Sequence, residues 1–408
     1  MYINSERNDI QMKKFFNINS GITLIGLVIT IIILLILTTV TVNVAIDSNL
    51  FGHARNAVNA MSQEEIKLQD EMNSLVDELN KFNIEPSDSI IPIYTKEQLM
   101  KIGSGEIIVI EEEETKRYRF NTDSNYILQN DIDISDEDWL PLSEFSGTLD
   151  GNNHSINGLT KNDSELYDFG FFQSLQGAVI KNLALTNVNI TVARGVGSLS
   201  PIMTNSTIEN CFVTGNMNIL AYGGGIVGCM GPNSIIRNCY TTCSITSTTT
   251  GGLWASTGGI VGWSAWNNGG GIIENCYSTS IITANNPYIG SIIGYNEDTE
   301  IKNCYALSHT ITGTYIWRVI GAFKTGTNNY AYKDMLINEE SRTSSDASST
   351  DGCDITLAEA TSQTHYETNG TWQFDNNGPW TFEYINVADG TNLPILKSFT
   401  SVVQSPKI

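Results

Sequence analysis

A short phrase recurs five times between residues 150 and 325: an isoleucine, one variable residue, an asparagine and then leucine or cysteine. Successive asparagines are separated by 28, 28, 37 and 28 residues. A fixed period of roughly 20–50 residues is typical of solenoids, propellers and arrays, in which each unit packs only on its neighbours. The repeat therefore predicts a stack of similar units. The asparagines are Asn182, Asn210, Asn238, Asn275 and Asn303.

A second phrase, framed by glycines, alternates with the first, as in Gly225-Ile226-Val227-Gly228. The segments between the glycines are short and β-branched, which indicates strands. A coil of about 28 residues holds three short strands, and coils stacked in parallel about 4.8 Å apart bury a continuous apolar column. We therefore predict a mainly β fold, a right-handed parallel β-helix or β-solenoid. A propeller is the alternative, but its blades need about 40 or more residues. The other framing glycines are Gly259, Gly262, Gly290 and Gly294.

The repeated residues are interpreted as structural. The asparagines are expected to form a ladder of side-chain amides or to cap turns, and the glycines are expected to permit tight bends. The residue after the asparagine is Leu183 in the first copy and cysteine in the others, which indicates a small buried apolar position. Disulfides between stacked copies are an alternative, whereas one ligand type in a line does not make a metal site. No metal or cofactor is predicted. The cysteines are Cys211, Cys239, Cys276 and Cys304.

The N-terminal region contains an uncharged run of 25 residues, 22–46, long enough to span a bilayer as a helix. Lys13 and Lys14 precede it, so the positive-inside rule places the N-terminus in the cytoplasm and the rest of the chain outside. Apolar residues then recur every three or four positions from Val58 to Leu79, which predicts an amphipathic helix that packs on the β domain or on a coiled-coil partner.

The junction Lys13-Lys14-Phe15-Phe16-Asn17-Ile18-Asn19-Ser20-Gly21-Ile22-Thr23-Leu24-Ile25 resembles the leader of type IV prepilins. The resemblance implies cleavage after Gly21 by a prepilin peptidase, methylation of Ile22 and contact with other pilins. Gly26 stands where the family carries a glutamate, which favours a minor or tip subunit, or a protein that does not polymerise. A cleaved signal peptide and an uncleaved signal anchor are the alternatives.

The glycine phrase and its copies resemble the GLUG motif of bacterial surface adhesins, which also occurs as an accessory region in some immunoglobulin A proteases. Two upstream stretches, residues 126–134 and 145–156, fit the same class of exported protein. The resemblance implies architecture and location but no chemistry. The expected organisation is a leader (1–21), a transmembrane helix (22–50), an amphipathic helix (51–84), an N-terminal cap (85–150), the solenoid (151–327) and a polar loop with a C-terminal cap (328–408).

The charge and the motifs limit the function. The 44 acidic and 22 basic residues disfavour nucleic acid as a partner. The sequence has no His-Glu-x-x-His zinc motif, and the acidic turn at residues 131–138 departs from a calcium loop. We therefore expect no enzyme but a membrane-anchored adhesive surface protein that binds a glycan or a host protein. The alternative is a carbohydrate-binding or polysaccharide-degrading β-helix, for which a sugar-stacking platform would be built from Trp254, Trp263, Trp266 and Trp317.

Overall fold

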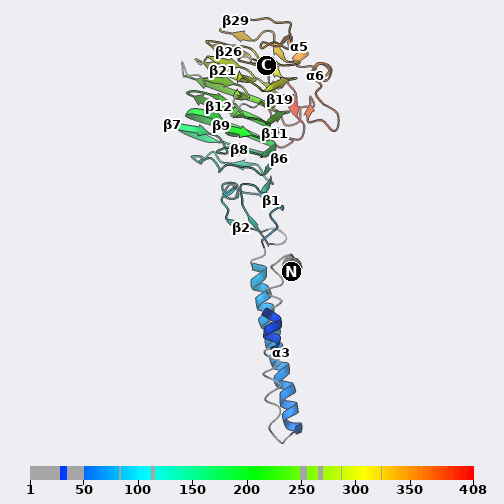
Figure 1. Ribbon diagram of the computed structural model, residues 1–408. Coiled ribbons are helices and arrows are strands. Elements are labelled where there is room, and N and C mark those ends of the chain that lie inside the picture. The colour runs from blue at the N-terminus through cyan, green and yellow to red at the C-terminus, as the bar shows by residue number, and fades with distance from the viewer. Residues whose placement is uncertain are drawn as a thin grey trace, which may run out of the picture. The chain divides into compact units, whose positions relative to one another are not determined.

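A computed structural model describes residues 28–34, 50–81, 84–111, 115–248, 255–264, 270–285, 287–322 and 324–408 (Figure 1). Within the long helix, side chains are described for residues 58–73. The chain divides into two units, Met1–Phe82 and Asn83–Ile408.

The N-terminal unit contains the helix α3 (Leu50–Lys81). Three apolar side chains of the predicted stripe are exposed: Val58 at 64%, Met61 at 51% and Met72 at 42%. Of the expected membrane helix, residues 28–34 are described and are helical, whereas Gly21, Ile22 and Gly26 lie outside the described residues. Among the helices described, none has both the length and the hydropathy of a membrane span.

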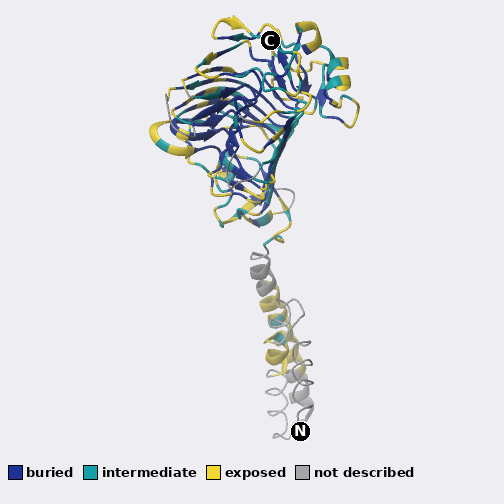
Figure 2. Ribbon diagram, turned by 45° about the horizontal axis from the view of Figure 1, so that its top comes forward, coloured by how far each residue is buried: buried dark blue, intermediate teal, exposed yellow. Residues whose placement is uncertain are grey.

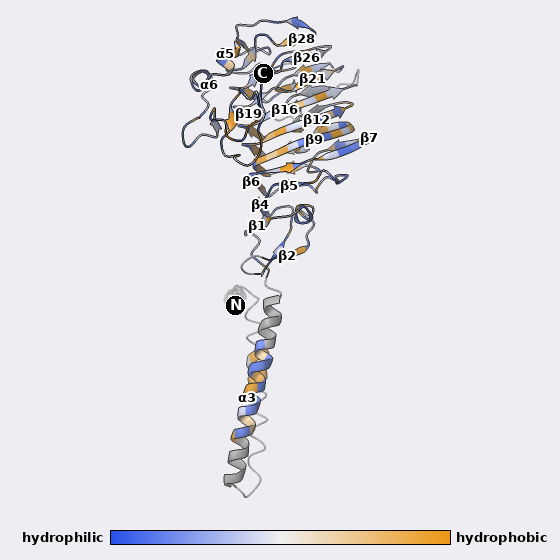
Figure 3. Ribbon diagram, turned by 180° about the vertical axis from the view of Figure 1, so that it is seen from behind, coloured by the Kyte–Doolittle hydropathy of each residue, from blue (hydrophilic) through white to orange (hydrophobic). Residues whose placement is uncertain are grey.

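The second unit is a β-solenoid of about seven coils, as predicted. Most of its strands form one sheet of 23 strands, and five more form a second sheet. Hydrophilic and hydrophobic residues alternate along strands such as β9 and β12 (Figure 3). The strands of the large sheet are β1 (Ile90–Ile93), β4 (Asn125–Leu128), β5 (Ile132–Asp133), β6 (Thr148–Asn157), β7 (Thr160–Phe169), β9 (Val179–Gly197), β11 (Thr207–Glu209), β12 (Phe212–Ile219), β13 (Gly223–Gly224), β15 (Ile235–Arg237), β16 (Tyr240–Ser247), β17 (Ser256–Gly258), β19 (Ile272–Glu274), β20 (Tyr277–Ser278), β21 (Ile281–Ala284), β22 (Tyr288–Gly290), β24 (Glu300–Lys302), β25 (Tyr305–Ala306), β26 (Thr310–Gly313), β27 (Tyr330–Tyr332), β28 (Leu336–Ile337), β29 (Glu340–Ser341) and β30 (Cys353–Ile355).

The remaining elements are few and short. Two antiparallel pairs join β2 to β3 and β31 to β32. The helix α4 begins after Thr95, whose side chain accepts from Gln98 N while the Gln98 side chain accepts from Thr95 N, so the two residues form a capping box. The five-stranded sheet contains β8 (Leu175–Gln176), β10 (Ser200–Thr204), β14 (Val227–Met230), β18 (Val261–Ser264) and β23 (Ile293–Asn296), and the other elements are β2 (Ile107–Glu111), β3 (Thr115–Arg119), α4 (Lys96–Leu99), α5 (Leu357–Ala360), α6 (Gln363–Asn369), β31 (Trp380–Thr381) and β32 (Ile395–Leu396).

One isoleucine from each repeat points into the solenoid, and successive copies lie in parallel register. All of them are fully buried, and burial extends along the strands of this unit (Figure 2). Stacking places each isoleucine on its counterpart, so the apolar column is continuous from coil to coil. The column consists of Ile180, Ile208, Ile236, Ile273 and Ile301.

An aromatic column lies on the outer side of the strands that follow the cysteines, because alternate strand residues point to opposite faces. The rings of Phe212, Tyr240 and Tyr277 stack with centroids 4.9 Å apart. This column is nevertheless fully buried, because the chain between residues 363 and 404 returns along it; we call this segment the C-terminal strap. The strap contributes the Trp380 ring, 5.8 Å from Tyr277, and the Phe399 ring, 5.1 Å from Phe212.

Candidate functional site: an outer aromatic face and its corner

The five repeat asparagines lie at corresponding corners of successive coils. Each has a positive φ, between 51° and 54°. Asn210 Nδ2 donates to Asn182 Oδ1 at 3.1 Å, Asn238 donates to Asn210 at 3.2 Å, and Asn303 donates to Asn275 at 3.2 Å. Asparagine suits both demands, since it tolerates the left-handed region and its amide both donates and accepts.

The repeat cysteines Cys211, Cys239, Cys276 and Cys304 are buried, and no disulfide forms: all seven cysteines are free thiols. Each repeat thiol donates to the carbonyl oxygen two residues earlier, as Cys211 Sγ does to Glu209 O at 3.2 Å. Burial raises the pKa of the Cys211 and Cys276 thiols. The cysteine column therefore packs as small buried side chains of the core.

The framing glycines lie where backbones of neighbouring coils approach closely. A Cβ on Gly225 or Gly259 would overlap a carbonyl oxygen of the next coil, and a Cβ on Gly262 would overlap the backbone of Gly223. Their φ angles are not among the positive ones, so space rather than backbone conformation requires glycine. Gly290 pairs with Gly258, one residue before Gly259, and Gly228 and Gly294 are similarly crowded by backbone.

The charged residues beside the asparagines form ion pairs between coils. Lys181 Nζ lies 3.3 Å from Asp150, Arg237 Nε donates to Glu209 at 2.7 Å, and Lys302 Nζ lies 3.1 Å from Glu274. Acidic and basic residues thus alternate along the stack. Because the pairs are partly exposed, each contributes little to the free energy of folding.

Two lysines pair with three of the five carboxylates in the acidic turn at residues 131–138. Lys96 Nζ lies 2.8 Å from Asp136 and 2.7 Å from Glu137, and Lys161 Nζ lies 3.0 Å from Asp138. The hydrogen bond from Lys96 lowers the pKa of Asp136. Across the described part of the chain, no three side chains of His, Cys, Asp or Glu gather in a way that could hold a metal ion.

The outer side of the five-stranded sheet carries a second apolar cluster, separate from the main core. Four of its residues lie in register, one per coil: Ile202, Cys229, Trp263 and Tyr295. Rings from the adjoining corner extend it: Tyr222 lies 6.1 Å from Trp263, and Tyr288 packs edge-on at 5.0 Å from Tyr295. We call this surface the outer aromatic face; it comprises Ile202, Tyr222, Cys229, Trp263, Tyr288 and Tyr295.

The tryptophan platform expected from the sequence is only partly described. Trp263 belongs to the outer aromatic face, and Trp317 is half-buried. Trp254 and Trp266 lie outside the described residues. The tyrosines of the face were missed, although Tyr222 and Tyr288 each stand two residues before a glycine of the register, Gly224 and Gly290.

A polar corner adjoins the outer aromatic face. Tyr222 donates its hydroxyl to Asp168 Oδ1 at 3.1 Å, and the Arg194 guanidinium lies over the Tyr167 ring, 4.9 Å from its centroid. Burial, and next the Asp168 charge, raise the pKa of Tyr222, so its hydroxyl stays protonated and donates. We call these four residues the tyrosine–arginine corner.

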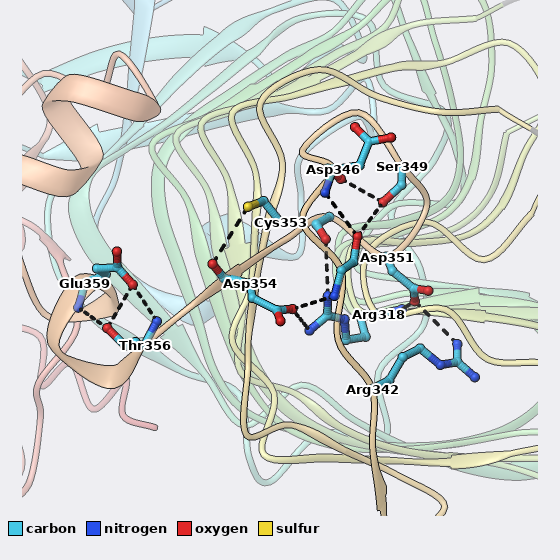
Figure 4. A network of polar contacts seen from close by, with 11 residues as sticks. Arg318, Arg342, Asp346, Ser349, Asp351, Cys353, Asp354, Thr356 and Glu359 are labelled. Atoms are coloured by element: carbon cyan, nitrogen blue, oxygen red, sulfur yellow. Dashed lines mark hydrogen bonds and ion pairs between the residues drawn. The ribbon is translucent and has the colours of Figure 1, made fainter.

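The last coil is closed by a network around Arg318, whose side chain is fully buried (Figure 4). Its Nη1 lies 2.7 Å from Asp354 Oδ1, and its Nη2 donates to Gly352 O at 3.2 Å. Asp351 accepts from the Arg318 backbone N–H at 3.0 Å and from Arg342 at 3.4 Å. Arg318 occupies the buried position that corresponds to Ser291 one coil earlier. Its positive charge is paired with Asp354 of the loop that closes the last coil.

The comparisons with known proteins concern the solenoid. Residues 121–215 match the family model described as the M26 IgA1-specific metallo-endopeptidase N-terminal region, and residues 285–312 match the GLUG motif. The GLUG resemblance is thereby confirmed. A comparison with curated proteins finds no match.

Two solved structures are similar. One, a candidate immunoglobulin A1 protease from Bacteroides ovatus, is 22% identical with a TM-score of 0.56, and the match covers 75% of this chain and 92% of that one. Another, an IgA1 protease, is 19% identical with a TM-score of 0.41 and covers 58% of this chain and 20% of that one. At such identities the likeness shows the fold, here the β-solenoid.

The expectation that the chain is no enzyme is contradicted by these findings. Residues 121–215 match a region of a metallo-endopeptidase family. The sequence argument relied on the missing zinc motif, although the GLUG motif also occurs in regions of immunoglobulin A proteases that are accessory to the catalytic centre. The prepilin resemblance is shown by none of the comparisons.

Proposed function

We propose that this chain is a surface-displayed β-solenoid that takes part in the proteolysis of immunoglobulin A1 by holding the antibody on its outer aromatic face. The observation that carries the proposal is the match of residues 121–215 to the N-terminal region of the M26 endopeptidases. The 22%-identical solenoid with an immunoglobulin A1 protease description supports it through the fold.

The architecture suits a binding role. Coils in parallel register give a regular surface that an extended chain can follow. Tyrosine and arginine are among the side chains that contribute most at protein interfaces. Tyr288 and Tyr295 of the outer aromatic face are partly exposed, and Tyr167 and Arg194 of its corner are exposed, whereas Trp263 is only 7% exposed. In this proposal the metal centre comes from another chain.

The test is the affinity of the purified full chain for immobilised immunoglobulin A1, with immunoglobulin G as the reference, by biolayer interferometry. We expect selective binding that Tyr295→Ala weakens about tenfold. The matched control is Leu140→Ala, since Leu140 is 74% exposed and lies outside the face. Equal or absent signals for the two antibodies would refute the proposal. Gel analysis of the same mixtures, with and without a chelator, shows whether the antibody is also cut.

We propose further that residues 22–46 anchor the chain in the membrane, with the β-solenoid outside the cell. The uncharged run and the preceding lysines support this. Cleavage after Gly21, methylation of Ile22 and a role as a minor, adhesive pilin-like subunit are its finer form. Mass spectrometry of the native N-terminus decides that form: N-methylated Ile22 supports it, whereas an intact Met1 leaves a plain anchor.

A further inference from the structure

The tyrosine–arginine corner is built by close steric fitting. Register places Tyr167 of β7 opposite Arg194 of β9, with a bulge in β7 between Asp163 and Tyr167. Asp168, the next residue, has a φ of 55°, and Gly195 has a φ of 71°. A Cβ at Gly195 would overlap Asp168 Oδ1. Glycine at this position therefore lets the carboxylate reach the Tyr222 hydroxyl.

Solvent reaches the corner. The Tyr167 ring is 57% exposed, and Asp168 and Arg194 are also exposed, whereas Tyr222 is 9% exposed. The Arg194 guanidinium covers one face of the ring. The other face is the apolar surface that a ligand can meet, and the carboxylate and guanidinium offer an acceptor and donors at its edge. A carboxylate has roughly four acceptor positions, so one bond from Tyr222 leaves Asp168 able to accept more.

The chemistry of the corner selects among ligands. A single carboxylate is too few oxygen ligands for a divalent cation, and no metal cluster occurs in the described residues. An anion would meet Asp168 and a chain of net charge −22. A neutral pyranose meets none of these penalties: its C–H face packs on a ring, and its adjacent hydroxyls donate to a carboxylate and accept from a guanidinium.

We infer that the tyrosine–arginine corner binds a neutral sugar residue, with the pyranose ring on Tyr167 and its hydroxyls on Asp168 and Arg194. The inference deepens the proposed function and rests on it for the source of the sugar, a glycan on the antibody. The glycan then positions the polypeptide along the adjoining outer aromatic face.

The first experiment uses small probes and is independent of the antibody. Saturation-transfer NMR with methyl α-galactoside and N-acetylglucosamine should show transfer from the full chain to ring protons, and glucuronate should show less. Asp168→Asn and Tyr167→Ala should each reduce transfer about tenfold. Tyr315→Ala is the matched control, since Tyr315 is 59% exposed, and should leave transfer unchanged. Absence of transfer with both neutral probes, or equal transfer in Asp168→Asn, overturns the inference.

The second experiment separates this inference from the proposed function. The full chain is tested against immunoglobulin A1 before and after enzymatic removal of its glycans. Binding that falls about tenfold on deglycosylation, and that Asp168→Asn lowers only for the glycosylated antibody, supports the corner. Equal binding to both forms overturns the corner while the proposed function stands. Absent binding to both forms refutes the proposed function, and the small-probe result still decides the corner.

Discussion

Tyr240 and Gln404 are 164 residues apart in the chain, and the Tyr240 hydroxyl donates to Gln404 Oε1 at 3.0 Å in a fully buried setting. Gln404 also accepts from Leu396 N at 3.0 Å and donates to Leu396 O at 2.8 Å. One amide side chain thus joins the strap to itself and to the solenoid.

Gln404→Ala is expected to destabilise the fold. The change leaves the Tyr240 hydroxyl and the Leu396 N–H buried without a partner, whereas Leu396 O still accepts from Phe399 N at 3.3 Å; the cost is about 2–3 kcal/mol. Urea unfolding followed by tryptophan fluorescence measures it, because Trp380 and Trp372 lie in the strap. Val403→Ala, at a residue 53% exposed, is the control and should change the midpoint little. Equal midpoints for the two variants would show that the buried amide is dispensable.

Arg318→Met should destabilise the last coil strongly. The substitution removes the counter-charge of Asp354, whose side chain is 28% exposed and still accepts from Ser344 N at 2.9 Å, so the loss should be about 2–3 kcal/mol, below that of a fully buried ion pair. The double variant Arg318→Met/Asp354→Leu should recover part of that loss, since the charge is then removed altogether. Lys324→Met is the reference, because the Lys324–Asp298 pair is exposed and should contribute less than about 1 kcal/mol. A loss for Arg318→Met no larger than for Lys324→Met would contradict the closing role of Arg318.

Substitutions at Asn238 separate the two requirements of the asparagine ladder, a left-handed backbone and an amide side chain that donates and accepts. Asn238→Gly keeps access to the left-handed backbone but loses the amide bonds, whereas Asn238→Ala loses both. The free energy of unfolding of the Asn238→Ala variant should therefore be about 1–2 kcal/mol lower than that of Asn238→Gly, which is the cost of the left-handed conformation for alanine. Thermal unfolding of the two variants beside wild type gives the comparison. If alanine equals glycine, the amide ladder rather than the backbone conformation sets the preference for asparagine.

His365 should make stability depend on pH below its ordinary pKa of 6.5. Burial lowers the pKa of His365 among the rings of Tyr305 and Tyr330, 5.9 and 5.2 Å away. The unfolded chain then binds the proton more readily than the folded one, so this contribution is fully present above pH 6.5 and is lost as pH falls through and below it. His365→Gln should reduce the dependence of the urea midpoint on pH between pH 6.5 and 5. A slope unchanged in His365→Gln would assign the effect to other groups, of which Glu359 faces the histidine.

The stacking of the coils followed from the sequence because the asparagine period encodes contacts between adjacent repeats. Burial of the isoleucine and cysteine columns followed as well, since a position that accepts Leu183 or cysteine is apolar. The strap did not. The aromatic run after the cysteines was visible, and strand alternation places it outward, but the sequence contains no periodic signal for what covers it.

The tyrosine–arginine corner was missed for a different reason. Asp168 and Tyr222 meet only because a bulge in β7 shifts its register against β9 and because Gly195 leaves room. Neither the bulge nor the register can be read from a repeat that begins one coil later. The enzyme expectation was wrong because the absence of one zinc motif does not exclude a likeness to the other regions of a metallo-endopeptidase, such as the one that residues 121–215 match.

The strap has a mechanical consequence. It bonds to three successive coils, through Tyr240 to Gln404, Tyr277 to the Pro394 carbonyl and the Asn303 carbonyl to Trp372. In a bare stack, a load on the last coil would peel one layer after another, because each layer is held only by its neighbour. A cross-tie over three layers shares that load, so this part should yield in one cooperative step at a higher force rather than in a series of small ones.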